Sequence, residues 1–240
     1  DALTFNGSSN PTVAGNISYA GNIVTSSQTG SSMTFTGDIQ AESFKVAHYY
    51  GRIHMAGNEL AVNKLWVGAG GGYDNSLYGA LDLDSGNVTT AGQVRLAELG
   101  HGVLNVNQGS SLTVSGSNDT HSTSASFLLA HWAYSGELNL RGGSLTALST
   151  SMRLSWDGTR TFNASSGTAD FLGMSFWASG NGSFRGSFLL GGATSGDARV
   201  NIGSSGITDV AGAAVIKLGE GTLGALSNWS IGYNPNFTPS

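Results

Sequence analysis

Apolar and polar positions alternate over residues 40–150, and one short pattern that recurs four times organises this alternation. Each copy reads Gly, any residue, apolar, any residue, apolar, and a Gly or an Asn-Glu pair follows within a few residues. Alternation with a period of two, bounded by Gly and Asn, is typical of half-buried strands. A strand–turn–strand unit that repeats along the chain predicts a solenoid rather than a globule. The four copies begin at Gly51, Gly79, Gly102 and Gly136.

The spacing of the copies predicts how the solenoid is built. The equivalent apolar residues Ile53, Leu81, Leu104 and Leu138 are separated by 28, 23 and 34 residues. Unequal spacing around a constant pattern indicates constant strands joined by loops of variable length. Stacked turns of such strands lie about 4.8 Å apart, so these four side chains would form one column inside the solenoid.

The prediction is therefore an all-β fold, a single-stranded right-handed parallel β-helix with variable loops. We assign the whole chain, residues 1–240, to one β-helix domain. The repeats are clear over residues 40–150. Residues 151–240 keep strand-like runs, and the sequence leaves open whether they continue the turns or form a capping region.

Composition supports a folded chain and restricts its possible functions. Of 240 residues 37 are Gly, 39% are hydrophobic and only 10% are charged, whereas disordered chains have few apolar residues and a high net charge. Ten scattered Lys and Arg residues in a chain of net charge −5 predict no nucleic-acid partner, because such a partner needs clustered cations. The lack of Cys excludes disulfides and thiolate metal sites. No run approaches the roughly 18 apolar residues of a membrane-spanning helix, so we expect no membrane insertion of this fragment.

Several segments carry a recognisable repeat. Residues 64–68 (KLWVG) and 79–83 (GALDL), with residues 93–116 and 126–148, resemble the repeat associated with autotransporter passengers and PEP-CTERM exported proteins of Gram-negative bacteria. Residues 217–223 (KLGEGTL) resemble the signature of autotransporter-associated β-strand repeats. The resemblance implies a parallel β-helix at an extracellular location or on the bacterial outer-membrane surface. The abrupt termini lead us to expect a piece of a longer polypeptide.

The outward positions of the repeats offer candidate catalytic residues. Residues i and i+2 of a strand share a face, so Asp82 and Asp84 would lie about 7 Å apart at the backbone. Glycosidases separate their acid and base by roughly 5–9.5 Å, and His54 would stand one turn away. The alternative is that these side chains are simply solvated and that their Asn neighbours form an amide ladder. The two outward columns hold His54, Asp82, Asn105 and Asn139, and then Ala56, Asp84, Asn107 and Arg141.

The same columns and nearby aromatic residues supply candidate ligand-binding groups. Asn105, Asn139 and Arg141 would offer amide and guanidinium hydrogen bonds. Trp66 and Trp132 would stack on sugar rings or, with equal weight, cap the core.

The sequence gives little support for a metal or cofactor site. His and Glu can hold zinc, but ligands in one column would be spread about 4.8 Å apart, so an ordinary Glu–His pair is the favoured interpretation. We expect no metal centre and no cofactor, with calcium possible in loops that contain Asp74-Asn75 and Asn118-Asp119. The column in question holds His48, Ala69, Glu98 and His131.

Three functions are compatible with these features. The leading hypothesis is a surface-exposed or secreted bacterial passenger fragment that binds host glycan or glycoprotein as an adhesin. The alternative is a secreted glycosidase- or aspartic-type hydrolase of a mucin-like substrate, with Asp82 and Asp84 as its paired aspartates. A structural stalk without a ligand is the third. The sequence does not predict an oligomeric state.

Overall fold

The computed structural model describes residues 1–27, 30–47, 51–69, 78–97, 100–116, 127–129, 135–156, 158–178, 186–191, 197–209 and 214–232. Regular structure in these residues consists of strands, and no helix occurs among them. The strands are β1 (Ala2–Gly7), β2 (Thr12–Val13), β3 (Ile17–Ser27), β4 (Ser32–Phe35), β5 (Ile39–Ala47), β6 (Gly51–Ala69), β7 (Tyr78–Leu96), β8 (His101–Asn107), β9 (Ser110–Val114), β10 (Phe127–Leu129), β11 (Ser135–Trp156), β12 (Thr159–Ala178), β13 (Gly186–Leu190), β14 (Ala198–Asp209), β15 (Ala214–Leu218), β16 (Gly221–Ala225) and β17 (Ile231–Gly232).

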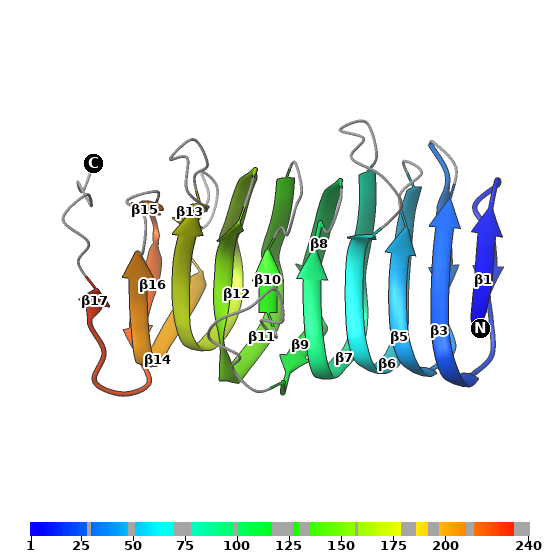
Figure 1. Ribbon diagram of the computed structural model, residues 1–240, viewed down its shortest axis with the longest axis horizontal. Helices are drawn as coiled ribbons and strands as arrows, with labels where there is room; N and C mark the ends of the chain where they lie inside the picture. The colour runs from blue at the N-terminus through cyan, green and yellow to red at the C-terminus, as the bar shows by residue number, and fades with distance from the viewer. Residues whose placement is uncertain are drawn as a thin grey trace.

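Every pairing between these strands is parallel, and each links a turn of the chain to the turn before or after it. The turns lie side by side along the long axis, with β1 at one end and β17 at the other (Figure 1). The predicted all-β parallel solenoid is confirmed. The right-handed winding of its turns remains a prediction.

Each turn contributes strand segments to three faces. The first face contains β4, residues 51–55 of β6, 79–83 of β7, β8, 136–141 of β11, 160–164 of β12, β13 and β15. The second face contains residues 17–19, 39–41, 60–62 and 88–90, then β9, 144–147, 168–171, 198–202 and β16. The third face contains β1, residues 22–25, 43–46, 64–67 and 93–96, then β10, 151–154, 173–176, 206–208 and β17.

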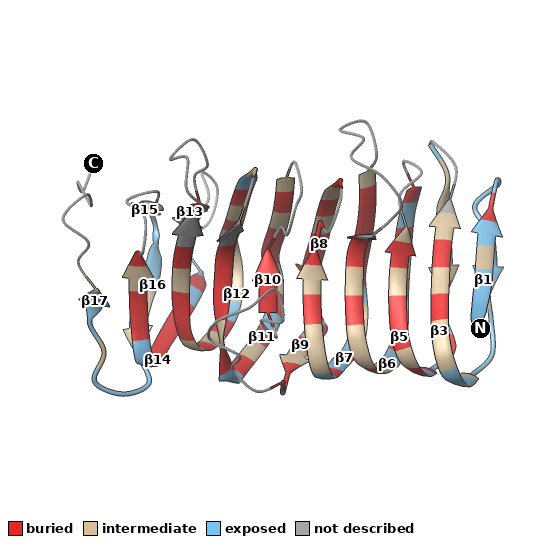
Figure 2. Cartoon of the chain, in the orientation of Figure 1, coloured by how far each residue is buried: buried red, intermediate tan, exposed pale blue. Residues whose placement is uncertain are grey.

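The core is a set of apolar columns that run along the axis. Ile53, Leu81, Leu104 and Leu138 pair in register and are each fully buried, as the spacing of the repeats predicts. Buried and partly exposed positions alternate along the strands in the middle of the molecule (Figure 2). Burial of a Leu or Ile side chain contributes on the order of 1.5–3 kcal/mol, and one turn cannot bury its inner face without its neighbours.

The two Gly positions of the repeat have different physical causes. Gly86 turns the chain between the first and second faces with a φ of 98°, and a Cβ there would lie 2.2 Å from the carbonyl oxygen of Asn58. Gly102 starts a first-face segment, and a Cβ there would lie 2.5 Å from the carbonyl oxygen of Val67. The first position needs a left-handed backbone and the second needs close approach of another turn.

Candidate functional site

The outward column of the first face brings four of the predicted site residues together. His54 pairs with Asp82, Asp82 with Asn105, and Asn105 with Asn139 in consecutive turns. The side chains of Asp82, Asn105 and Asn139 are not solvated, although they lie outside the core, whereas His54 is partly exposed. Asp82 is 3% exposed, and Asn105 and Asn139 are each 1% exposed.

The carboxamides of this column form a hydrogen-bonded ladder. Asn105 Nδ2 donates to Asp82 Oδ1 at 2.5 Å, and Asn139 Nδ2 donates to Asn105 Oδ1 at 2.9 Å. Asn163 Nδ2 extends the ladder by donating to Asn139 Oδ1 at 3.3 Å. We call Asp82, Asn105, Asn139 and Asn163 the amide ladder. Since each buried amide oxygen or nitrogen meets the next turn, stacking satisfies the hydrogen-bonding groups that burial would otherwise leave costly.

The second oxygen of Asp82 is held by a cation that the site prediction omitted. Arg52 Nη1 donates to Asp82 Oδ2 at 2.7 Å. Partial burial acts to lower the pKa of Arg52, but the negative charge and hydrogen bond of Asp82, together with smaller contributions from Tyr78, raise the pKa above its ordinary value. Arg52 stands two residues before His54, so the same period-two pattern that identified the column also points to it.

Tyr78 and Glu137 complete this polar cluster, and both were also missed. Burial raises the pKa of Tyr78, and the charges of Glu137 and Asp82 raise it further, while Arg52 acts in the opposite direction. Glu137 Oε1 also accepts a hydrogen bond of 2.7 Å from Asn139 Nδ2. The cluster therefore joins residues from β6, β7 and β11 on one outer surface.

Asp84 lies at the edge of the column and is much more accessible than Asp82. A shift in register sets Ser85, rather than Asp84, opposite Ala56. Asp84 Oδ2 lies 2.6 Å from His54 Nδ1, and Asp84 Oδ1 accepts a hydrogen bond of 3.0 Å from Asn107 Nδ2. The Asp84 side chain is 43% exposed, against 4% for Asp82. Arg141, the predicted ligand-binding cation, pairs with Asn107 and is exposed.

These contacts restrict what the two aspartates can do. Both oxygens of Asp82 accept hydrogen bonds from side chains, and its side chain is almost completely covered. A glycosidase acid must hold a proton and reach the glycosidic oxygen. Of the three predicted catalytic residues, only His54 and Asp84 are accessible. A histidine oriented by a carboxylate is the arrangement of a general base.

Trp66 lies on the third face, apart from the first-face column. Lys45 Nζ lies 4.1 Å and Arg95 Cζ lies 5.5 Å from its ring centroid. These residues come from the turns before and after Trp66, so its ring is stacked between two cations. A sugar ring would have to displace one of them, and each such contact is worth roughly 0.5–2 kcal/mol.

The remaining predicted residues give no further site. Trp132, His48, Glu98 and His131 lie outside the described residues, as do the loop pairs proposed for calcium. Within the described ranges, no group of three or more His, Asp or Glu side chains is arranged to hold a metal ion. No helix in the described part of the chain is long and apolar enough to cross a membrane.

The second face carries a groove that the site prediction missed. A hollow of about 430 Å³ is lined by Asn16, Asp38, Gln40 and Glu59, together with Ile17, Ser18, Ile39 and Ala61. A second hollow of about 320 Å³ continues it toward the third face and shares Gln40 and Ala61. Together they cross five turns, a length of about 19 Å at the usual strand spacing.

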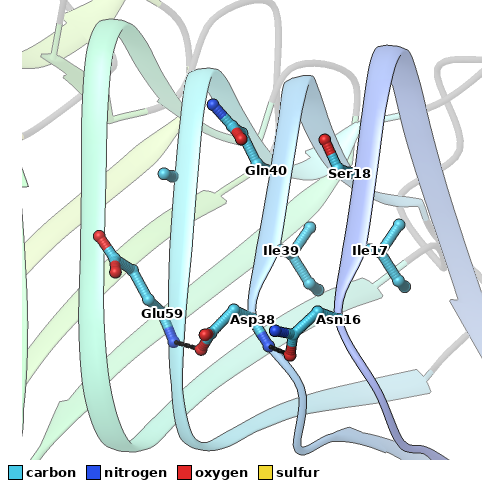
Figure 3. Close-up of a pocket in the computed structure, with 8 residues that line it drawn as sticks. Asn16, Ile17, Ser18, Asp38, Ile39, Gln40 and Glu59 are labelled. Atoms are coloured by element: carbon cyan, nitrogen blue, oxygen red, sulfur yellow. Dashed lines mark hydrogen bonds between the residues drawn. The ribbon is translucent and has the colours of Figure 1, made fainter.

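Backbone capping fixes one edge of this groove. The N–H of Asp38 donates to Asn16 Oδ1 at 3.0 Å, and the N–H of Glu59 donates to Asp38 Oδ1 at 2.9 Å. Figure 3 shows these three residues in one row, with Ser18 and Gln40 in a second row. Asn16, Asp38, Gln40 and Glu59 are exposed. Unlike the amide ladder, this surface presents accessible polar side chains.

The fold and these surfaces define the protein as an all-parallel β-solenoid with polar outer columns. No protein-family model, curated protein or solved structure matches the chain.

Proposed function

We propose that this solenoid is a binding protein without catalytic activity, and that it holds an extended neutral glycan in the groove of the second face. The observation that carries the proposal is the groove itself, a hollow that runs across several turns and is lined by accessible carboxylate, amide and hydroxyl groups. Such groups donate and accept hydrogen bonds with sugar hydroxyls.

The charge of the groove favours a neutral ligand. Asp38 and Glu59 line it, and no Lys or Arg is among the residues that line either hollow. A carboxylated or sulfated sugar would meet repulsion from both carboxylates, while a neutral polysaccharide would not. A rod-shaped protein also lets one chain-like ligand contact equivalent positions in successive turns.

Display outside a bacterial cell is the setting that we propose for this binding. The support is the resemblance of residues 64–68, 79–83 and 217–223 to the repeats of exported passenger proteins. In that setting the ligand would be a host glycan or glycoprotein, and the protein would act as an adhesin.

A secreted hydrolase remains the second candidate because of one contact. His54 Nδ1 lies 2.6 Å from Asp84 Oδ2, which would orient the imidazole as a general base toward mucin-like substrates. The burial of Asp82 weighs against a paired-aspartate mechanism. Release of sugar or peptide from mucin, abolished by Asp82→Asn with Asp84→Asn, would establish hydrolysis in place of simple binding.

The test is binding to an array of neutral and acidic oligosaccharides and to immobilised mucin. We expect binding to neutral oligosaccharides, and at least a tenfold loss of affinity in a double variant with Gln40→Ala and Glu59→Ala. The matched control carries Gln108→Ala and Glu220→Ala, which alter exposed residues of the same types outside the groove. An empty array, or equal binding by the groove variant and its control, would overturn the proposal.

A further inference from the structure

One buried hydroxyl on the second face has no hydrogen-bond partner. Thr90 is 1% exposed, and its Oγ1 meets no donor or acceptor among the described residues. The carbonyl oxygen of Thr90 is paired, because it accepts a hydrogen bond of 2.8 Å from the N–H of Ser115. A buried hydroxyl without a partner destabilises a folded protein, so its presence at this position calls for an explanation.

Packing does not explain a Thr at position 90. Thr90 pairs in register with Val62 in the turn before and with Val114 in the turn after, and both Val side chains are buried. Val has the same branching at Cβ as Thr but carries no hydroxyl. A Val at this position would continue the column and leave no polar side chain unpaired.

Thr25 on the third face shows how a buried Thr is ordinarily accommodated. Thr25 is fully buried and pairs with Val46 in the next turn. Its Oγ1 donates to the carbonyl oxygen of Lys45 at 3.1 Å. Thr90 is as deeply buried, but the described residues give its hydroxyl no such acceptor. The two residues therefore differ in their hydrogen bonding and not in their burial.

Thr90 lines the second hollow, of about 320 Å³, and its neighbours there suit a sugar ring. Ala41, Ala61 and Val62 line the same hollow and offer methyl groups on which the C–H groups of a sugar can pack. Ala61 follows the longer Gln40 in its outward column, and its small side chain leaves space at this point of the surface.

Asn63 gives the same hollow a polar group that is already held in place. Its Nδ2 donates to Glu42 Oε1 at 3.1 Å. Its Oδ1 lies over Gly92, where a Cβ would be only 2.4 Å away. A side chain fixed in this way loses little freedom when a ligand binds.

We propose that the second hollow selects one sugar unit of the glycan, and that Thr90 is its specificity-determining residue. This inference rests on the proposed binding of a neutral glycan in the groove. One sugar ring packs its C–H groups on Ala41, Ala61 and Val62, and one of its hydroxyl groups hydrogen-bonds with Thr90 Oγ1. A unit without that hydroxyl leaves Thr90 unpaired and binds more weakly.

Thr90→Val tests the inference through affinity and stability together. Neutral hexasaccharides of galactose, N-acetylglucosamine and mannose are the probes. We expect the affinity for the probe that the parent protein binds most tightly to fall at least tenfold. The midpoint of thermal unfolding should stay equal or rise, because the variant buries no unpaired hydroxyl.

Thr25→Val is the matched control. It removes a buried hydroxyl that does have a partner, the carbonyl oxygen of Lys45, on a different face. Its unfolding midpoint should therefore fall while its affinity for the probe stays at the parent value. The two variants make the same chemical change and should give opposite results.

The outcomes separate this inference from the proposed function. Parent-like affinity in Thr90→Val, or a lower unfolding midpoint in that variant, would overturn the role of Thr90. Weak binding by the variant with Gln40→Ala and Glu59→Ala would in that case still support the groove. A parent protein that binds none of the probes would overturn both proposals.

Deoxy analogues of the bound probe identify the hydroxyl that Thr90 recognises. Each analogue replaces one sugar hydroxyl with hydrogen. One of them should bind the parent protein at least tenfold more weakly than the complete sugar does, and Thr90→Val should bind this analogue and the complete sugar equally. Equal losses in the parent and the variant for every analogue would contradict a contact at Thr90.

Discussion

The amide ladder of the first face and the groove of the second face are both rows of outward polar side chains, but they differ in what those side chains contact. In the ladder, the carboxamide of each Asn meets the polar side chain of the next turn, and Asp82, Asn105 and Asn139 are almost fully buried. In the groove, Asn16 and Asp38 cap backbone N–H groups while Gln40 and Glu59 stay exposed.

The difference shows what happens when the same type of polar side chain repeats in register along a solenoid. Its donors and acceptors are then used in hydrogen bonds between turns and are not accessible to a ligand. Asn stacks on Asn because each carboxamide has both a donor and an acceptor. In the groove column, Asn16 and Asp38 accept hydrogen bonds from backbone N–H groups of the next turn and not from its side chains, so Gln40 and Glu59 stay accessible. The ladder is therefore expected to contribute stability, and the groove to contribute binding.

The largest expected effect comes from interrupting the ladder. Asn105→Ala removes the donor to Asp82 Oδ1 and leaves this buried carboxylate oxygen without its side-chain partner. It also removes one of the two acceptors of Asn139 Nδ2, which keeps Glu137 Oε1. We expect the free energy of unfolding to fall by about 3 kcal/mol. Urea denaturation followed by circular dichroism measures the change.

Asn107→Ala is the matched control for that variant. Asn107 donates to the exposed Asp84, where water replaces the lost bond, so the expected cost is below about 1 kcal/mol. Equal destabilisation by the two variants would show that burial does not distinguish the ladder from its exposed neighbour.

Loss of the charge at Asp82 should lower the free energy of unfolding more than loss of the charge at Asp84. Both effects should be smaller than that of Asn105→Ala. Asp82→Asn weakens a pair with Arg52, which is 45% exposed, so solvent screening limits the expected loss of unfolding free energy to about 1–2 kcal/mol. Asp84→Asn alters an exposed contact and should cost about 0.5 kcal/mol or less. Thermal unfolding of the two single variants compares them. A larger loss from Asp84→Asn would contradict the assigned burial.

Tyr78 should make the first face sensitive to alkaline pH. Burial raises the pKa of Tyr78 above its ordinary value of 10.0. The unfolded chain loses this proton first, so stability is fully present below pH 10.0 and falls as the pH rises toward the folded pKa. Unfolding measured between neutral and alkaline pH should show this decline, and Tyr78→Phe should reduce it. If the stability of Tyr78→Phe declined as much as that of the parent protein at alkaline pH, groups other than Tyr78 would cause the decline.

The smallest effect is expected at Glu42, near the groove. Hydrogen bonds from Asn63 and Lys64 lower the pKa of Glu42 below its ordinary value of 4.5. Its contribution to stability is present above pH 4.5 and is lost as the pH falls through the folded pKa. Glu42→Gln should slightly weaken the acid dependence of unfolding, and a stronger acid dependence in this variant would show that the sign is wrong.

The sequence predicted the features that repetition encodes. Equivalent residues such as Ile53 and Leu81 identified the inner column, and the parallel solenoid followed from it. The same alignment brought Asp82, Asn105 and Asn139 together and included an amide ladder among the alternatives. It also placed Lys45, Trp66 and Arg95 at equivalent positions of successive turns, so the contact of Trp66 with two cations could have been predicted from the alignment.

The repeat pattern did not predict the burial of the outer residues or the location of the groove. Asp82 is covered because long side chains such as Arg52 contact it, and the repeat specifies alternation rather than the depth of an outer position. The groove begins at Asn16, before the clear repeats, and a shift in register between Tyr19 and Asn22 interrupts the pairing of that turn. Capping of one turn by the side chain of another became visible only in three dimensions.

The most direct test of the central claim compares the groove and the ladder in one binding measurement. An oligosaccharide selected on the array would be titrated into the variant with Gln40→Ala and Glu59→Ala and into the variant with Asp82→Asn and Asp84→Asn, both shown to be folded by circular dichroism. We predict at least a tenfold loss of affinity in the groove variant and wild-type affinity in the variant with Asp82→Asn and Asp84→Asn. The reverse result would contradict the assignment of binding to the second face.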